Sequence, residues 1–186
     1  MKHHRLQAVA IVAALGVVAW WGFYVWHDHR EDGVIIAAAR RYGVEPALVK
    51  AVMWRESWFN PRVRGSHGEF GLMQVTEPAA GEWVDAEHIK NFQPEHLFDP
   101  VTNASAGTFY LGKLLKRYPQ TDNPIPYALA DYNAGRTHVL RWSKGAAATN
   151  SAAFLAQMDF PGTRKYIRAI MRRRIHYLPE FVEEQK

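Results

Sequence analysis

The sequence contains no cysteine, which excludes a disulfide framework, a thiolate metal site and a lipid-modified N-terminal cysteine. It also lacks a large excess of charge, since the formal net charge is only +5 in 186 residues. A surplus this small suits an acidic polymer but is far from the basic surface of a nucleic-acid-binding protein, so we expect no nucleic-acid partner. No stretch alternates apolar and polar residues convincingly, which argues against a β-sheet.

What the sequence has in quantity is aromatic residues: seven Trp, eight Tyr and nine Phe. They supply material for a core and can line a groove for flat-faced ligands. Beyond an N-terminal segment the chain has room for one compact domain of roughly 150 residues. Internal repeats, linkers and low-complexity segments are absent from the sequence. We therefore predict a single mainly α-helical domain over residues 31–186.

The N-terminal segment is apolar enough to cross a membrane. After Lys2 and Arg5, no residue from Leu6 to Trp26 carries a charge, and about 20 such residues span a hydrocarbon core of about 30 Å. This length without breakers is unlike a buried core helix. The run closes with an aromatic belt, made of Trp20, Trp21, Tyr24 and Trp26. Bulky aromatics stand where a signal peptide would need small residues for cleavage, so we predict an uncleaved transmembrane anchor at 1–30.

Helix start and stop signals divide the remaining chain. Proline at a first helical position, Asp, Asn or Thr before it, and glycine after the last turn are typical boundaries. They predict helices over roughly the following residues: 33–42, 46–57, 76–83, 100–118, 125–132, 136–144, 150–157 and 161–178. Residues 85–98 are mixed and loop-like.

The most informative stretch is Met53 to Pro61. The helix that begins at Pro46 has an apolar stripe of Val49, Val52 and Met53, and the next slot on that face is Glu56. Burial and the helix C-terminus both disfavour a carboxylate anion, so the pKa of Glu56 should rise, as a general acid requires. Position alone also permits a solvated Glu56 paired with Arg55 or Arg62.

Three islands occur in a fixed order along the chain: Glu56-Ser57-x-Phe59-Asn60-Pro61, Gly71-Leu72-Met73-Gln74, and Ala128-Leu129-Ala130-Asp131-Tyr132-Asn133-Ala134-Gly135. Together they resemble the catalytic domain of the soluble lytic transglycosylase (SLT) family, which has a lysozyme-like fold. The segments Asp99-Pro100-x-x-Asn103-x-x-x-Gly107-x-x-Tyr110-Leu111 and Pro161-x-Thr163-Arg164-x-Tyr166-Ile167 are similar to that family as well. The resemblance covers about residues 34–178.

The resemblance implies cleavage of the β-1,4 bond between N-acetylmuramic acid and N-acetylglucosamine in peptidoglycan, with formation of a 1,6-anhydro ring. Glu56 would be the single catalytic acid and base. Gln74, the backbone around Met73, Tyr132 and Asn133 would line the cleft, with Tyr132 within hydrogen-bond reach of Glu56. The side chains of Leu72 and Met73 more simply pack in the core, Asn133 can also cap its helix, and Ser57 more simply ties the turn to the helix than performs chemistry.

Several positions depart from the family pattern. The family commonly has Ser where Gly65 stands, and here Ser66 follows one residue later as the candidate substrate-binding hydroxyl. Small residues are common where Glu69, Phe70 and Asp131 stand. Glu69 or Asp131 near Glu56 would activate a water and turn lysis into hydrolysis, although both are more simply solvated surface acids.

Other features add no further chemistry. His67, His88, His96, His138 and His176 form no metal-ligand spacing, so we expect no metal and no cofactor. The basic run from Arg164 to Arg174 suits peptide-stem carboxylates or lipid phosphates, but such runs are more often solvated faces.

The expected protein is thus a lytic transglycosylase acting on peptidoglycan glycan strands. Positive charges precede the anchor, while the flank from His27 to Asp32 has one Arg against three acids. This predicts a single-pass inner-membrane protein with its catalytic domain facing the periplasm. The alternatives are a muramidase that hydrolyses the same bond and a non-catalytic peptidoglycan-binding module. Service to a secretion or pilus machine is compatible with the small size and the anchor.

Overall fold

The structure is a computed structural model that describes residues 2–182, apart from the side chains of residues 2–6 and 8–10. The chain divides into two compact units, Met1–Gly33 and Val34–Lys186.

The first unit is dominated by α1 (Lys2–His29). One stretch, Ile11–Tyr42, holds a helix long and apolar enough to cross a membrane by length and composition, and only 6% of its apolar window is buried. Its large apolar side chains point outward all around the helix, as expected of a segment solvated by lipid. They include Ile11, Val12, Leu15, Val17, Val18, Trp20, Trp21, Phe23 and Trp26.

The second unit is helical, as the sequence predicts. After α2 (Asp32–Tyr42), which begins at the end of the first unit, its α-helices are α3 (Pro46–Ser57), α4 (Glu77–Ala86), α5 (Pro100–Leu115), α6 (Pro124–Ala134), α7 (Arg136–Trp142), α8 (Ser151–Gln157) and α9 (Pro161–Tyr177). Up to residue 182 the unit also contains three short 3-10 helices: η1 (Pro94–Phe98), η2 (Gly145–Ala148) and η3 (Leu178–Phe181). Within residues 2–182 the only β pairing is two isolated bridges, Arg64 with Phe70 and Phe70 with Val75.

The helix boundaries follow from the capping signals. The side chain of Thr76 accepts a hydrogen bond from the Ala79 N–H at the start of α4, and Asp99 does the same for Thr102 at the start of α5. Asn123 caps α6 through the Ile125 N–H. Each cap satisfies a backbone donor that the first helical turn leaves open. The last turn of α5 ends at Leu115, three residues before the predicted Tyr118.

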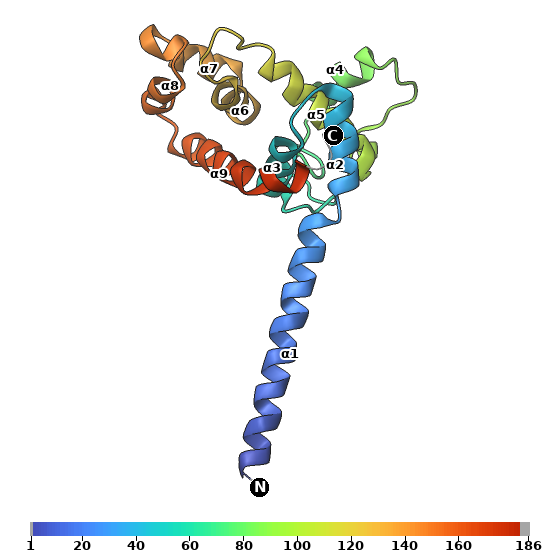
Figure 1. Ribbon diagram of the computed structural model, residues 1–186. Helices are drawn as coiled ribbons and strands as arrows, with labels where there is room; N and C mark the ends of the chain where they lie inside the picture. The colour runs from blue at the N-terminus through green and yellow to red at the C-terminus, as the bar shows by residue number, and fades with distance from the viewer. Residues whose placement is uncertain (1, 183–186) are drawn as a thin grey trace. The chain divides into compact units, whose positions relative to one another are not determined.

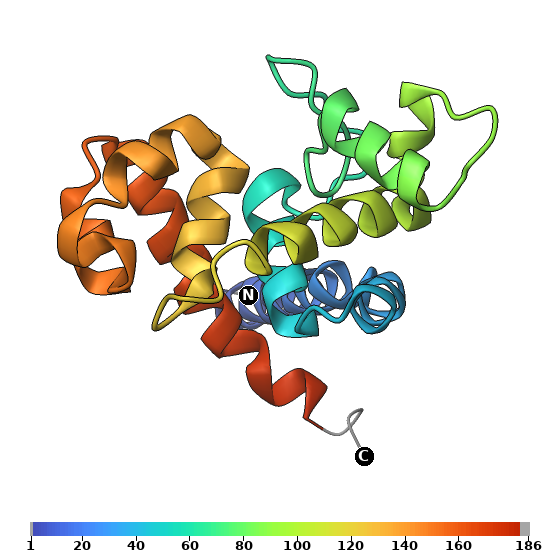
Figure 2. The same ribbon diagram turned by 90° about the horizontal axis from the view of Figure 1, so that it is seen from above.

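Within this unit α3 lies between two groups of helices (Figures 1 and 2). α6, α7, α8 and α9 gather on one side, and α2, α4 and α5 lie on the other. α3 packs most extensively against α9, and α5 packs against both α4 and α6. The stripe of Val49, Val52 and Met53 on α3 is fully buried. Because α3 is central, its C-terminal end lies where the helix groups and the 63–75 loop meet.

The loop that follows α3 is anchored by one buried side chain on α5. Oδ1 of Asn103 accepts from the Met73 N–H at 2.8 Å, and its Nδ2 donates to the carbonyls of Phe70 at 2.8 Å and Leu97 at 2.7 Å. Gly71, with φ of 68°, leaves room for this amide, since a Cβ there would lie 2.4 Å from Nδ2 of Asn103. A left-handed turn without a side chain is what allows the loop to lie directly on α5.

Candidate active site

A cavity of about 360 Å³ lies at the end of α3. Most of the residues predicted to form the site line it. The complete lining is Glu56, Gly65, Ser66, Glu69, Gln74, Thr76, Tyr132 and Asn133. These residues come from α3, from the 63–76 loop and from the end of α6, which are far apart in sequence. The cavity therefore brings together the first and third islands of the sequence, with Gln74 from the second.

The backbone after Glu56 turns sharply and fixes the helix end. Trp58 and Phe59 have φ values of 52° and 56°, a left-handed conformation that ends the helix in the αL manner. Ser57 Oγ donates to the carbonyl of Leu72 at 2.7 Å and lies 3.3 Å from the carbonyl of Met53. The predicted structural role of Ser57 is thus confirmed, and it also ties α3 to the loop that carries Gln74.

Glu56 has a tyrosine as its partner rather than an arginine. The hydroxyl of Tyr166, on α9, donates to Oε1 of Glu56 at 2.5 Å, while the Arg55 guanidinium lies over the Tyr166 ring at 5.5 Å. Burial raises the pKa of Glu56 to about 7, and the negative charge of Glu69 raises it as well. The Tyr166 hydrogen bond and the positive charge of Arg55 act in the opposite direction and lower it. Desolvation is the largest cause, because an anion loses most when water is removed. Near neutral pH this carboxyl can therefore both donate and accept a proton.

Tyr132 and Asn133 line the cavity, but the hydroxyl of Tyr132 is used elsewhere. It donates to the carbonyl of Met73 at 2.7 Å. The resemblance implies that Tyr132 lies within hydrogen-bond reach of Glu56, and the tyrosine that donates to Glu56 here is Tyr166. Oδ1 of Asn133 accepts from Thr163 Oγ1 at 2.9 Å. Through these bonds α6 is fixed to both the loop and α9.

Gln74 is held in a left-handed backbone conformation, with φ of 47°. Its Nε2 donates to the carbonyls of Gly71 at 2.9 Å and Val63 at 3.2 Å, so Oε1 is the atom it offers to the cavity. Ser66 is exposed, and its Oγ lies 3.1 Å from Nδ1 of His67. Both residues line the cavity.

Met73 is the predicted residue that does not line the cavity. Its side chain is fully buried and lies against Gly107, where an added Cβ would be 2.5 Å from its Sδ. Its N–H is bonded to Asn103 and its carbonyl to Tyr132. Met73 thus supports the loop from behind, as its apolar character also suggests.

Asp131 and Glu69, the two acids that depart from the family pattern, lie in different surroundings. Asp131 is buried, with Oδ2 2.6 Å from Arg117 Nη1 and accepting from the Tyr118 hydroxyl at 2.5 Å. The expectation that Asp131 is a solvated surface acid is wrong, because it forms a buried ion pair and is not part of the cavity lining. The side chain of Glu69 is 25% exposed and lines the cavity together with Glu56.

Tyr166 contacts Glu56, and the sequence patterns did not single it out as a site residue. It lies 110 positions after Glu56, and no local periodicity links the two. The available signal was its place in the Thr163-Arg164-x-Tyr166 stretch, which also supplies the Asn133 partner.

Tyr166→Phe should raise the pKa of Glu56 further above 7, by up to about one unit, since the lost hydrogen bond favours the carboxylate form. An infrared titration of the carboxyl stretch measures this directly. Tyr127→Phe is the matched control, because the Tyr127 hydroxyl donates to the Ala147 carbonyl away from Glu56. An unchanged or lower pKa in Tyr166→Phe would contradict the assigned bond.

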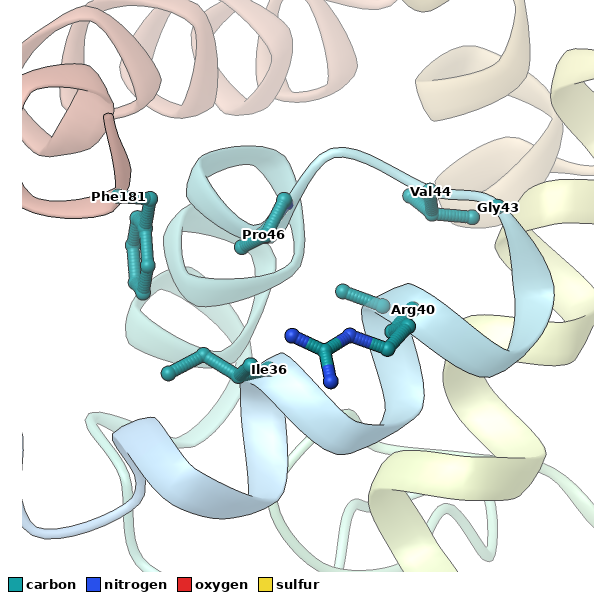
Figure 3. Close-up of a pocket in the computed structure, with 7 residues that line it drawn as sticks. Ile36, Arg40, Gly43, Val44, Pro46 and Phe181 are labelled. Carbon is teal, nitrogen blue, oxygen red and sulfur yellow. The ribbon is translucent and has the colours of Figure 1, made fainter. Parts of the chain in front are cut away.

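Two of the other hollows that the described residues line differ in their relation to Glu56. One, of about 480 Å³, shares Glu56 with the cavity and adds Trp58, Val63 and Lys165 to its walls. The other, of about 420 Å³, lies between α2, α3 and η3 and has mostly apolar walls (Figure 3). In Figure 3 the Arg40 guanidinium points into this apolar group, and among the described residues it is the one charged side chain of the lining. Because the described part of this lining holds neither an acid nor a nucleophile, the second hollow is not a candidate active site.

Comparison with known proteins gives several similar chains. Membrane-bound lytic murein transglycosylase C from Shigella sonnei (strain Ss046) and from Klebsiella pneumoniae (strain 342) are each 40% identical over 119 residues, which covers 61% of this chain. The match covers 33% of those proteins, so the chain spans about a third of the length of these curated relatives.

Solved structures have the same fold. An inactive mutant of the lytic transglycosylase Slt from Pseudomonas aeruginosa superposes with a TM-score of 0.73 at 23% identity, over 80% of this chain and 24% of that one. The 70 kDa soluble lytic transglycosylase from Escherichia coli gives 0.68 at 27% identity, over 78% and 24%. The complex of the 70-kDa soluble lytic transglycosylase with bulgecin A gives 0.71 at 26%, over 81% and 24%.

These likenesses confirm the mainly α, SLT-like fold that the sequence predicts. The family model described as "Transglycosylase SLT domain" matches residues 33–155, which include Glu56 and the cavity lining. By this match, the chain belongs to the transglycosylase SLT domain family.

Proposed function

We propose that this protein is a peptidoglycan lytic transglycosylase in which Glu56 is the single acid and base. The observation that carries the proposal is a carboxyl with its pKa raised to about 7 in a cavity lined by polar side chains. Family membership and the names of the relatives support the same reaction and the same substrate. Glycan would extend to both sides of Glu56, since two hollows share this residue.

In the proposed reaction protonated Glu56 donates its proton to the glycosidic oxygen as the C1–O bond of the muramoyl unit breaks. The resulting carboxylate then takes the proton of the sugar's C6 hydroxyl, whose oxygen bonds to C1. The proton lost in the first step is regained in the second, so neither water nor a second carboxylate is consumed. A pKa near the working pH suits both steps, because the group must be a competent acid and then a competent base. The Tyr166 hydrogen bond orients the carboxyl and stabilises it as the anion between the two steps.

The other cavity residues would hold the sugars. Gln74 offers an acceptor through Oε1, Asn133 offers amide donors, and Ser66 offers an exposed hydroxyl. Tyr132 would act indirectly, since its bond to the Met73 carbonyl fixes the cavity wall. Sugar amides and hydroxyls are matched by such groups.

Hydrolysis of the same bond is the second candidate, because Glu69 is a second carboxylate in the same cavity. An inverting hydrolase needs a second carboxylate about 6.5–9.5 Å from the acid, with a water between the two groups.

The full chain in detergent, incubated with purified sacculi, distinguishes lysis from hydrolysis by mass spectrometry of the released muropeptides. Products one water lighter than hydrolysis gives would support the proposal, and reducing-end products would replace it with a muramidase. Binding to sacculi without products would favour a binding module.

We further propose that α1 anchors the protein in the inner membrane with residues 31–186 in the periplasm, close to its substrate. The exposed apolar surface of α1 and the word "membrane-bound" in the names of the relatives support an anchor. Action at one place in the wall, for a secretion or pilus machine, is compatible with this arrangement.

Protease added to spheroplasts should degrade the catalytic unit and leave only an N-terminal fragment, because Lys2 and Arg5 keep that end in the cytoplasm. Immunoblotting with antibodies to each end gives the result. A catalytic unit that resists protease until the membrane is lysed would show the opposite orientation.

A further inference from the structure

Gly65 and Glu69 share one space in the wall of the cavity around Glu56. A Cβ atom added to Gly65 would lie 2.1 Å from Oε2 of Glu69 and 2.8 Å from Oε1 of Gln74, far inside van der Waals contact. The φ angle of Gly65 is not in the left-handed region, so the backbone conformation does not require glycine. Glycine is instead required at position 65 by steric exclusion, because the Glu69 carboxylate occupies the space that a side chain would need.

The turn between these two residues holds the carboxylate in place. The Gly65 N–H donates to the Glu69 carbonyl at 2.8 Å, and the Gly68 N–H donates to the Gly65 carbonyl at 3.3 Å. The His67 N–H donates to Oε2 of Glu69 at 3.0 Å, and Nδ1 of His67 lies 3.6 Å from Oε1. A carboxylate held from its own turn has little freedom to swing into solvent, so its position beside Gly65 is built into the loop.

Hydrogen-bond acceptors gather at this wall. Nε2 of Gln74 donates to the carbonyls of Val63 and Gly71. The other amide atom, Oε1, therefore faces Gly65. The Glu69 carboxylate accepts and does not donate when ionised. Glycan hydroxyls and acetamido N–H groups are donors of the kind that such a wall binds, and bonds to a charged acceptor are stronger than neutral ones.

We propose that Glu69 is a substrate-positioning residue. With Oε1 of Gln74 it accepts hydrogen bonds from a hydroxyl or acetamido N–H of the sugar bound beside Glu56, in the room that Gly65 leaves open. The proposal rests on the proposed function, since it takes a glycan as the ligand.

The same carboxylate also acts on Glu56. Its charge adds to burial in raising the pKa of Glu56, against Tyr166 from α9 and Arg55 from α3. Tyr132 from α6 lies within electrostatic range of Glu56 as well, and His67 is the titratable group paired with Glu69 in its own turn. Removing the charge of Glu69 should therefore lower the pKa of Glu56 and move the alkaline limb of the pH–rate profile to lower pH, which a purely structural role would not do.

The test combines Glu69→Ala, Gly65→Ser and the double variant, with Glu69→Gln for the pH profile and Glu95→Ala as the exposed control. On sacculi, each single variant should lose about tenfold to hundredfold in kcat/KM, as expected for a hydrogen bond to a charged group. The double variant should lose clearly less than the two single losses combined, because Glu69→Ala removes the nearest atom that a Cβ at position 65 would meet. Binding of an N-acetylglucosamine hexamer to the same variants in a Glu56→Gln background should weaken in parallel.

Failure of the positioning role and failure of the proposed function give different results. If the natural chain cleaves sacculi while Glu69→Ala and Gly65→Ser stay within about twofold of it, or if their losses add, the positioning role fails and the function stands. If the natural chain does not cleave but binds the hexamer, and Glu69→Ala weakens that binding, the function fails and the positioning role stands. If it neither cleaves nor binds, both fail.

Discussion

Glu56→Gln should lower kcat by about a hundredfold to ten-thousandfold, the usual contribution of a positioned acid and base. Glutamine keeps the shape and can still accept the Tyr166 hydrogen bond, but it has no proton to give to the glycosidic oxygen. The measurement is the rate of muropeptide release from sacculi. KM should change little, because the lost interaction exists only in the transition state.

The same variant should be more stable than the natural chain at alkaline pH. The pKa of Glu56 is raised from 4.5 to about 7 in the folded chain, so between these values the folded chain holds a proton that the unfolded chain has released. The free energy of unfolding therefore falls as pH rises through this window. At about pH 8 Glu56→Gln should gain on the order of 2–3 kcal/mol, and at about pH 4 the difference should vanish.

Glu95→Gln is the matched control for both effects. Glu95 is exposed on η1, so its change should leave the rate and the pH dependence of unfolding as they are. A Glu56→Gln variant that keeps about a tenth or more of the natural rate, or that is destabilised at alkaline pH, would contradict the role and the environment assigned to Glu56.

Asn103→Ala should destabilise the fold by about 3–5 kcal/mol. The substitution removes three hydrogen bonds and leaves the Met73 N–H and the Phe70 and Leu97 carbonyls buried without their partner. It also opens a cavity under the loop that carries Gln74. Chemical denaturation of the detergent-solubilised chain, followed by tryptophan fluorescence, measures the loss.

Asn150→Ala gives the comparison within the same chain. Asn150 makes one cap bond, to the Ala153 N–H at 2.9 Å, and its loss should cost about 1 kcal/mol. Equal losses in the two variants would mean that the loop is not held through Asn103.

The helices were predictable because their signals are local. Thr76, Asp99 and Asn123 each cap the helix that follows, and a cap involves only residues within one turn. Burial of the Glu56 face was predictable for a similar reason, since Val49, Val52 and Met53 set the period. The order of the three islands then supplied the family.

The partners of the site residues were not predictable from the same patterns. The Tyr166 bond to Glu56 joins α9 to α3, and the Asp131 pair with Arg117 joins α6 to the turn that follows α5. Such contacts depend on how helices pack, which no spacing rule in one sequence encodes. Gly65 and Glu69 were visible as two separate departures from the family pattern, but only the structure shows that one side chain fills the space of the other.

The most direct test of the account is cleavage of sacculi by the full chain in water enriched in the heavy oxygen isotope, with mass spectrometry of the products. The C6 hydroxyl of the sugar is the proposed nucleophile, so muropeptides should carry 1,6-anhydro ends and no heavy oxygen. Incorporation of one heavy oxygen at the new end would show attack by water. That result would contradict the single-residue mechanism of Glu56 and make Glu69 the first candidate for the second carboxylate.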